Sequence, residues 1–290
     1  MNEAIKQMIR PYNCQTPADY KNAFKEIIQE IALLGLSRQG FFDVAAFYGG
    51  TALRIVHKLG RFSEDLDFSL LKENKEFDLS NYLRGIEDEL LTYNLKMKSE
   101  IKEKNIETAI ESAFLKGNTI EILLSIDEWE QKKIPLNKND TVFVKLEIDT
   151  GPPVPSGEVE TVFSTQPIPY SFKIYTLPSL FAGKIHAVLC RKFKSGRVKG
   201  RDFYDFVWYM NKGIIPDLDY LKAKMIQSGH WSSSAPLDLH VLKDLLIKKF
   251  TEMDWKNAGK DVAPFIKDPF ELEVWSKEFF VSLLMKWEKH

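Results

Sequence analysis

Two aspartates stand one residue apart in the stretch RFSEDLDF, residues 61–68. Asp65 and Asp67 alternate with apolar residues, which is typical of a β-strand with one polar and one apolar face. Two carboxylates held this close repel each other unless a cation lies between them. Oxygen ligands of this kind suit Mg²⁺ or Mn²⁺. The pair therefore predicts either a metal site or a solvated strand face beside a basic residue such as Arg61, and the pair alone does not decide between them.

A second segment, VFVKLEID at residues 142–149, alternates in the same way and places Lys145, Glu147 and Asp149 on its polar face. If this strand lies beside the first one, Glu147 or Asp149 can supply a third carboxylate. Three carboxylates on adjacent strands can hold two metal ions about 4 Å apart. An ordinary polar sheet face is the alternative, because the sequence does not show that the two strands are neighbours.

A glycine pair, Gly49 and Gly50, ends the apolar segment FFDVAAFY and opens a short predicted helix with Thr51 as its cap. Glycines at such a junction let backbone N–H groups approach a phosphate closely, and a helix N-terminus favours an anion. A strand-to-helix turn that needs a positive φ explains the same pair more simply. Taken alone, the glycine pair favours the simple turn.

Positive charge gathers later in the chain, where residues 184–201 contain seven Lys or Arg residues and no acidic residue. Such a patch could neutralise a triphosphate or an RNA backbone, or it could be a solvated loop. Lys184 lies close to an apolar helical stripe, where a lysine must snorkel, form a pair or face a site. The next predicted helix carries Asp202 beside its apolar stripe and an Arg201–Asp205 pair at i,i+4 spacing.

The elements that must position these residues fall into two parts. Residues 1–174 read as a mixture of strands and helices, with helices predicted at 18–35 and 79–93. Residues 175–290 read as helices separated by Gly, Pro, Ser or Asp breaks. We therefore expect an α/β domain over residues 1–174 and a helical domain over residues 175–290.

Composition narrows the class of protein. The 290 residues are 44% hydrophobic and 28% charged, with a formal net charge of −1, so any nucleic-acid surface must be local. No segment approaches the ~18 consecutive apolar residues of a membrane span, and no secretory signal is visible. The two cysteines are far apart in the sequence and lack metal-type spacing, and two free thiols fit a reducing cytosol. The five scattered histidines argue against a zinc site. We expect a cytoplasmic protein without membrane contact.

Three segments in this order carry a resemblance to a known family: FYGGTALRIVHKLGRFSEDLDFSL, then VKLEI, then LFAGKIHAVLCRK followed by KGRDFYDF. They resemble the AbiEii-type nucleotidyltransferase toxins, which belong to the DNA polymerase β-like nucleotidyltransferase superfamily. The resemblance covers roughly residues 41–210, and the remaining C-terminal residues match only in being helical. It implies an α+β fold, with a polymerase β-like core around a mixed sheet followed by an all-helical C-terminal half.

The resemblance also assigns roles. It implies a set of metal ligands, namely Asp65, Asp67 and Glu147, with Asp149 as a weaker candidate for the third position. It implies a set of catalytic residues, namely Asp65, Asp67, Lys184, Asp202 and Asp205. It implies a set of nucleotide-binding residues, namely Gly49, Gly50, Thr51, Ser63 and Arg201.

The activity that the resemblance implies is Mg²⁺-dependent transfer of a nucleotide from an NTP to an acceptor hydroxyl, with Mn²⁺ as an alternative metal. The acceptor in this family can be the 3′ end of tRNA, and its members act as toxins or in phage defence with a separately encoded antitoxin. Two other functions remain open. One is a non-catalytic regulator that binds NTP or RNA, and the other is a small-molecule (antibiotic) nucleotidyltransferase. The residues identify neither the NTP nor the acceptor.

Overall fold

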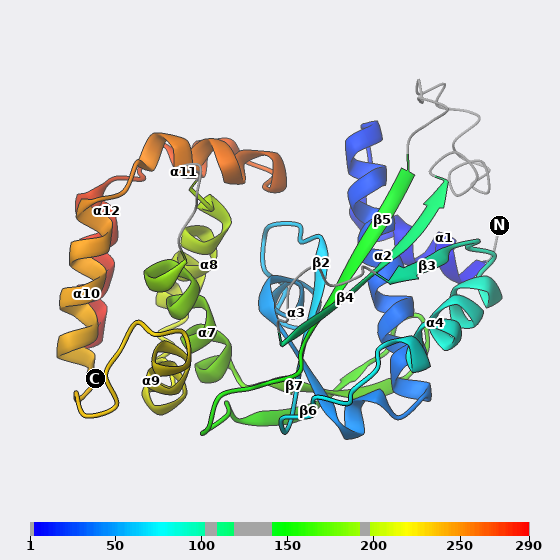
Figure 1. Ribbon diagram of the computed structural model, residues 1–290. Helices are drawn as coiled ribbons and strands as arrows, with labels where there is room; N and C mark the ends of the chain where they lie inside the picture. The colour runs from blue at the N-terminus through cyan, green and yellow to red at the C-terminus, as the bar shows by residue number, and fades with distance from the viewer. Residues whose placement is uncertain (1–2, 102–108, 119–140, 192–197, 290) are drawn as a thin grey trace. The chain divides into compact units, whose positions relative to one another are not determined.

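The structure is a computed structural model that describes residues 3–101, 109–118, 141–191 and 198–289 (Figure 1). The chain divides into two compact units. Unit 1 comprises Met1–Lys58, Phe62–Pro152 and Glu160–Ile174, and unit 2 comprises Leu59–Arg61, Pro153–Val159 and Tyr175–His290. Within the described ranges, no helix combines the length and the apolar character needed to cross a lipid bilayer.

A mixed sheet forms the centre of unit 1, with the strand order β3-β4-β5-β2-β1-β7-β6. The strands are β1 (Ala45–Tyr48), β2 (Asp65–Leu70), β3 (Lys98–Ile101), β4 (Ile110–Asn118), β5 (Thr141–Asp149), β6 (Val159–Ser164) and β7 (Tyr170–Tyr175). Strand β1 pairs antiparallel with β2 and parallel with β7, and β2 pairs parallel with β5. The apolar residues that alternate along β2 and β5 are buried, which fixes the face that each strand turns to the core.

Four α-helices accompany this sheet: α1 (Glu3–Ile9), α2 (Pro17–Arg38), α3 (Gly49–Ile55) and α4 (Ser80–Thr92), with short 3₁₀ turns η1 (Arg10–Tyr12) and η2 (Phe41–Asp43). Helix α2 is capped by Thr16, which forms a capping box with Asp19, and Pro17 occupies the first helical position. It packs against α4. The predicted helices at 18–35 and 79–93 are therefore present. The predicted strand TIEILLSI lies outside the described residues.

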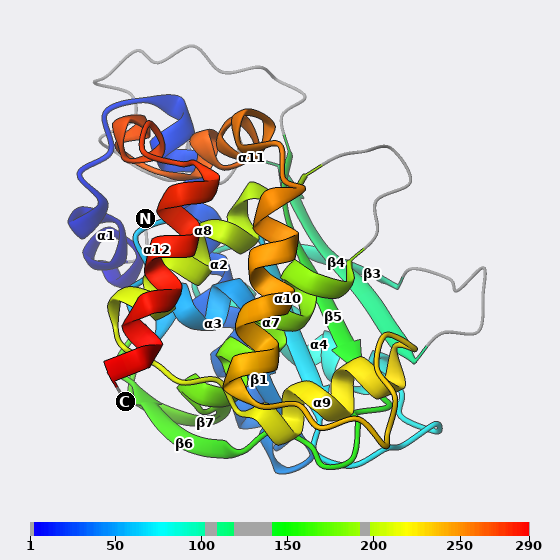
Figure 2. The same ribbon diagram turned by 90° about the vertical axis from the view of Figure 1, so that its left-hand side faces the viewer.

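Unit 2 is helical in its described part. Its α-helices are α7 (Leu177–Cys190), α8 (Gly200–Asn211), α9 (Leu218–Gln227), α10 (Leu239–Thr251), α11 (Trp255–Val262) and α12 (Lys277–Leu284). Three 3₁₀ segments accompany them, η3 (Ala263–Phe265), η4 (Pro269–Leu272) and η5 (Met285–Lys289). Figure 2 shows α10 and α12 side by side, and these two helices are in contact. The mixed sheet and the helical second half confirm the α+β fold class.

Aromatic rings fill the interior of unit 2. Phe206 of α8 lies 5.4 Å from Phe250 of α10, and Phe280 of α12 stacks on Trp255 at 4.1 Å, all between ring centroids. Helix α8 also approaches α11 closely, because a Cβ atom on Gly200 would lie 1.8 Å from the Ala258 carbonyl oxygen. This glycine lets the start of α8, which carries the predicted site residues, rest directly on α11.

Candidate functional site

The two acidic strands are neighbours. In the parallel pairing of β2 with β5, Asp67 stands opposite Glu147, and Ser69 stands opposite Asp149. Paired residues of adjacent strands point to the same side of a sheet and lie about 4.8 Å apart. Glu147 is thus the β5 carboxylate beside the Asp65–Asp67 pair. The Asp149 carboxylate instead accepts a hydrogen bond from the Gly151 backbone N–H at 3.0 Å.

The three carboxylates differ in their present partners. Asp65, Asp67 and Glu147 are all half-buried, and the Lys145 ammonium group contacts the Glu147 carboxylate within the same strand. Among the residues that the structure describes, no group of three or more His, Cys, Asp or Glu side chains is arranged to hold a metal ion. Glu147 would therefore have to exchange Lys145 for a metal ion in order to join the two aspartates.

The glycine pair lies directly against the acidic strand. Helix α3 begins at Gly49, which has a φ of 82°, and a Cβ atom on this residue would lie 2.3 Å from Asp67 Oδ2. Both the positive φ and the close approach require glycine here. Gly49 and Asp67, which are 18 residues apart in the sequence, therefore meet, because Tyr48 at the end of β1 pairs with Asp67.

The prediction that Thr51 caps this helix is wrong. The helix begins at Gly49, and its N-cap residue is Tyr48, which makes no side-chain capping bond. Thr51 lies inside the helix with 0% exposure, and its hydroxyl donates a hydrogen bond to the Asp65 carbonyl oxygen. Thr51 therefore fixes the backbone at the start of β2 from within the helix.

Ser63 lies two residues before β2, in the segment that leads into the acidic strand. Its carbonyl oxygen accepts a hydrogen bond from Gln29 Nε2 at 3.2 Å, and the next residue, Glu64, binds Lys25 of α2 at 2.8 Å. Two contacts with α2 thus hold the entry to β2 in unit 1.

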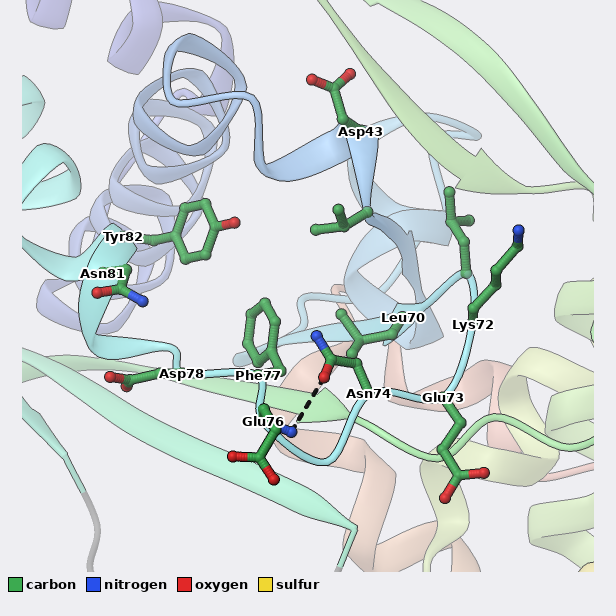
Figure 3. A pocket seen from close by; sticks show the side chains of 12 residues that line it. Asp43, Leu70, Lys72, Glu73, Asn74, Glu76, Phe77, Asp78, Asn81 and Tyr82 are labelled. Atoms are coloured by element: carbon green, nitrogen blue, oxygen red, sulfur yellow. Dashed lines mark hydrogen bonds between the residues drawn. The ribbon is translucent and has the colours of Figure 1, made fainter.

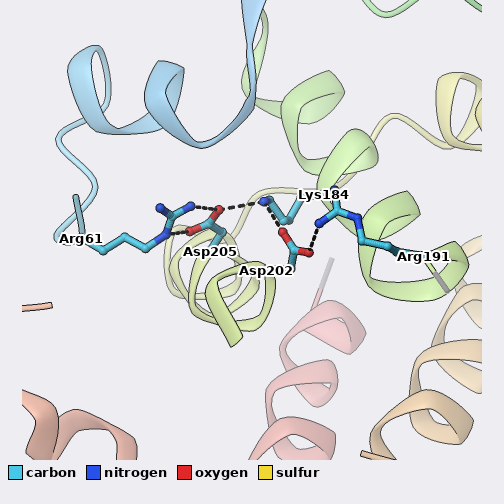
Figure 4. A network of polar contacts seen from close by, with 5 residues as sticks. All are labelled: Arg61, Lys184, Arg191, Asp202 and Asp205. Atoms are coloured by element: carbon cyan, nitrogen blue, oxygen red, sulfur yellow. Dashed lines mark hydrogen bonds and ion pairs between the residues drawn. The ribbon is translucent and has the colours of Figure 1, made fainter. Parts of the chain in front are cut away.

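The remaining predicted acids and the lysine form a network within unit 2 (Figure 4). Asp205 accepts two hydrogen bonds from Arg61, from Nε to Oδ1 and from Nη2 to Oδ2, both at 2.6 Å. Lys184 Nζ lies between the two acids, 2.9 Å from Asp205 Oδ2 and 2.8 Å from Asp202 Oδ1. Arg191 Nη1 binds the other oxygen of Asp202 at 2.8 Å. Three cations and two carboxylates leave this network with one excess positive charge.

Burial makes the electrostatics of this network strong. The side chains of Asp205 and Arg61 are 0% and 3% exposed, and the Lys184 side chain is 12% exposed. Burial alone would lower the pKa of Lys184, but Asp202 and Asp205 outweigh it and raise that pKa above its ordinary value. Burial likewise opposes ionisation of Asp202, yet Lys184 and Arg191 lower its pKa to about 2. Lys184 and Asp202 are thus both charged at neutral pH.

Sequence reasoning missed the role of Arg61. The sequence suggested Arg61 as a partner for the acidic strand and Arg201 as the helical partner of Asp205. The structure shows Arg61 bound to Asp205, which is 144 residues away, and the Arg201 guanidinium 4.2 Å from the centroid of the Phe265 ring. No local spacing signals a pair so distant in the chain. The only signal in the sequence was the position of Arg61 itself, four residues before Asp65.

Part of the predicted basic patch, residues 192–197, lies outside the described residues. Its described members include Lys184, Arg191, Lys199 and Arg201, which lie on or next to α7 and α8. Burial and the nearby Arg191 lower the pKa of Lys199. Arg191 directly follows α7, Lys199 directly precedes α8, and Arg201 is the second residue of α8. Positive charge therefore concentrates at these helix ends.

A cavity of about 610 Å³ lies elsewhere in unit 1 (Figure 3). Its lining includes Asp43, Leu70, Asn74 and the stacked rings of Phe77 and Tyr82. The cavity adjoins the C-terminal end of β2, whereas the acidic pair occupies the N-terminal half of that strand. None of the predicted site residues lines it, so we do not assign the nucleotide site to this cavity.

Comparisons with known proteins identify the family. Residues 31–281 match the family model described as "Nucleotidyl transferase AbiEii toxin, Type IV TA system". No curated protein gives a match. The chain is similar to the crystal structure of JHP933 from Helicobacter pylori, with 16% identity, 92% of this chain and 95% of that chain covered, and a TM-score of 0.48. It is also similar to MenT4, a nucleotidyltransferase toxin from Mycobacterium tuberculosis H37Rv, with 14% identity, 98% and 99% coverage, and a TM-score of 0.48.

The family model alone decides the identity, because it spans most of the chain and includes both acidic strands and the Lys184–Asp202 network. The resemblance noted in the sequence is thereby confirmed. The chain belongs to the AbiEii family of nucleotidyl transferase toxins of Type IV toxin–antitoxin systems, whose enzymes are NTP-dependent nucleotidyltransferases.

Proposed function

We propose that the protein transfers a nucleotide from an NTP to an acceptor hydroxyl at the 3′ end of tRNA, and that it does so with Mg²⁺ bound. One observation carries this proposal. The β2–β5 register places Glu147 beside the Asp65–Asp67 pair, and Gly49 rests against Asp67 in the same place. A glycine pair in contact with clustered carboxylates can bring a triphosphate and its metal ions together.

The donor set fits Mg²⁺ or Mn²⁺ in its chemistry. Asp65, Asp67 and Glu147 supply carboxylate oxygens, which these ions prefer, and all three side chains reach solvent. When bound, the metal supplies charge neutralisation on the phosphates and a more acidic acceptor hydroxyl. Asp65 and Asp67 would hold it, and Glu147 would join them on release from Lys145. Thr51 supports this set by fixing the Asp65 backbone.

The nucleotide needs cations as well as metal ligands. We assign Lys184 to the phosphates, because its ammonium group is charged and belongs to a network with a positive excess. Asp202 orients that ammonium group through its 2.8 Å contact. Gly49, Gly50, Ser63 and Arg201 are proposed to bind the nucleotide itself. Catalysis would then rest on positioning and charge stabilisation.

The proposal also names an RNA acceptor, an antitoxin and a cellular compartment. The described cations near the ends of α7 and α8 suit a phosphate backbone, and RNA contacts of this type weaken as salt rises. Membership of a Type IV toxin–antitoxin family supports a separately encoded antitoxin. Both tRNA and NTP are abundant in the cytoplasm, where we propose that the protein acts.

The direct test incubates purified protein with Mg²⁺, bulk tRNA and each labelled NTP in turn. We expect label on the RNA, and none when periodate has first destroyed the 3′ terminal diol of the tRNA. Tight NTP binding without transfer would instead support a non-catalytic regulator. Label on added aminoglycosides but not on RNA would support a small-molecule nucleotidyltransferase, and either result would overturn the tRNA proposal.

A further inference from the structure

We infer that Arg61 and Asp205 are positioning residues, which set the place and charge of the Lys184 ammonium group without touching the substrate themselves. This inference rests on the proposed function, because it concerns how Lys184 meets the NTP phosphates. It also changes the role of Asp205, which the sequence suggested as a catalytic acid.

Burial keeps the Asp205 carboxylate away from substrate. Its side chain is 0% exposed. Arg61 occupies both carboxylate oxygens through two hydrogen bonds of 2.6 Å, and Lys184 takes a further position on Oδ2 at 2.9 Å. A carboxylate enclosed in this way neither reaches a nucleotide nor accepts a metal ion. Asp205 can therefore act only through the cations that it contacts, Arg61 and Lys184.

Arg61 competes with Lys184 for the negative charge of Asp205. Both cations bind the same oxygen, Oδ2, and the two parallel bonds from the planar guanidinium hold the carboxylate in one orientation. Asp205 is therefore shared between two cations. Without Arg61, Lys184 would be the remaining cation on Asp205, and more of its charge would be neutralised internally. The arginine thus preserves the positive excess that a phosphate requires.

Arg61 also has an unusual place in the chain. Residues Leu59–Arg61 belong to unit 2, although the segments on both sides of them belong to unit 1. Arg61 precedes Asp65, the first residue of β2, by four positions. The chain that leads into the proposed metal ligands therefore starts from a residue that is fixed in the Lys184 network.

The competing explanation is that Arg61 and Asp205 form a buried ion pair that only stabilises unit 2. The double variant Arg61→Met with Asp205→Leu separates the two explanations, because a buried ion pair can often be replaced by apolar residues of similar volume without loss of folding. The matched control is Arg38→Met with Glu89→Leu. This 2.7 Å pair of unit 1 also has a buried carboxylate, and neither of its residues belongs to the proposed site.

The measurement is the affinity of each folded protein for α,β-methylene NTP analogues with Mg²⁺, from pH 6 to pH 10. The double variant keeps the single excess positive charge but removes the Asp205 contact that holds the Lys184 ammonium group in place. We therefore expect binding to weaken about tenfold or more in the double variant and to remain unchanged in the control. The remaining binding should also fade at a lower alkaline pH than in the wild-type protein. The physical reason is that Asp205 raises the pKa of Lys184 by more than Arg61 lowers it, so the ammonium group loses its proton earlier when both are removed.

A double variant that binds the analogues like the wild-type protein, with the same pH profile, would overturn the inference. If the double variant does not fold, Arg61→Lys gives the result instead. A lysine keeps the charge but cannot form the two parallel bonds, so we expect severalfold weaker binding, and unchanged binding would overturn the inference. Label transfer to RNA by the wild-type protein tests the proposed function separately, since it can fail while the binding differences stand.

Discussion

The choice between Glu147 and Asp149 shows what strand register adds to residue type. Both are acids on the polar face of one strand, and both neighbour β2. Glu147 stands beside Asp67, with Lys145 as its present partner, whereas Asp149 stands beside Ser69 and accepts a hydrogen bond from the Gly151 N–H. A two-residue step along β5 thus separates a proposed metal ligand from a residue that holds a turn.

This difference predicts opposite results for two isosteric variants. We expect Glu147→Gln to lower the rate of nucleotide transfer by about 100-fold, because an amide cannot share a metal ion with Asp67 as a carboxylate does. We expect Asp149→Asn to stay within about threefold of the wild-type rate, since its Oδ1 can still accept the bond from Gly151. Initial rates at saturating NTP and Mg²⁺ decide the matter. Loss of activity in Asp149→Asn alone would reverse the assignment.

At the scale of elements, the sequence predicted those parts whose signals are local. The alternation along residues 65–68 and 142–149 predicted β2 and β5, because buried and exposed residues follow the two-residue period of a strand. The sequence did not predict that the two strands pair, because pairing depends on chain topology. Strands β4 and β6 also gave no clear signal.

The two clearest differences from expectation also have physical reasons. Thr51 has the residue type of a helix cap, but its hydroxyl binds the Asp65 carbonyl, a partner that is distant in sequence. Arg61 follows the same logic, since its partner Asp205 becomes a neighbour only in the folded chain. Local propensity predicts what a side chain can bind, and the fold decides which partner it finds.

At the scale of the whole molecule, the net charge of −1 does not reveal that some carboxyl groups are buried, and that their ionisation lowers the stability of the folded state. Glu30 of α2 is 7% exposed, and burial together with the neighbouring Glu26 raises its pKa to about 7. A carboxyl group whose pKa is raised in the folded state holds its proton more tightly there than in the unfolded chain. Its stabilising contribution is therefore complete below about pH 4.5 and is lost as the pH rises through 7.

We accordingly expect Glu30→Gln to raise the free energy of unfolding of unit 1 at pH 8 by an amount on the order of 1–3 kcal/mol. At pH 4.5 the variant and the wild-type protein should be nearly equal. Urea unfolding at several pH values measures both quantities, and the difference between the two proteins removes the contributions of other groups. Exposed Glu76 provides the control variant Glu76→Gln, which should keep the wild-type pH dependence. A stability difference that does not change between pH 4.5 and pH 8 would contradict this account.

The central claim is that the carboxylates of β2 perform nucleotide transfer, and one substitution tests it most directly. The Asp65→Asn variant is compared with the wild-type protein and with Asp43→Asn, a carboxylate variant just before β1 and outside the proposed site. Labelled NTP, bulk tRNA and Mg²⁺ are supplied to all three proteins, and circular dichroism confirms that each is folded. We predict label on RNA with the wild-type protein and Asp43→Asn, and none above background with Asp65→Asn. Full label transfer by folded Asp65→Asn would contradict the account.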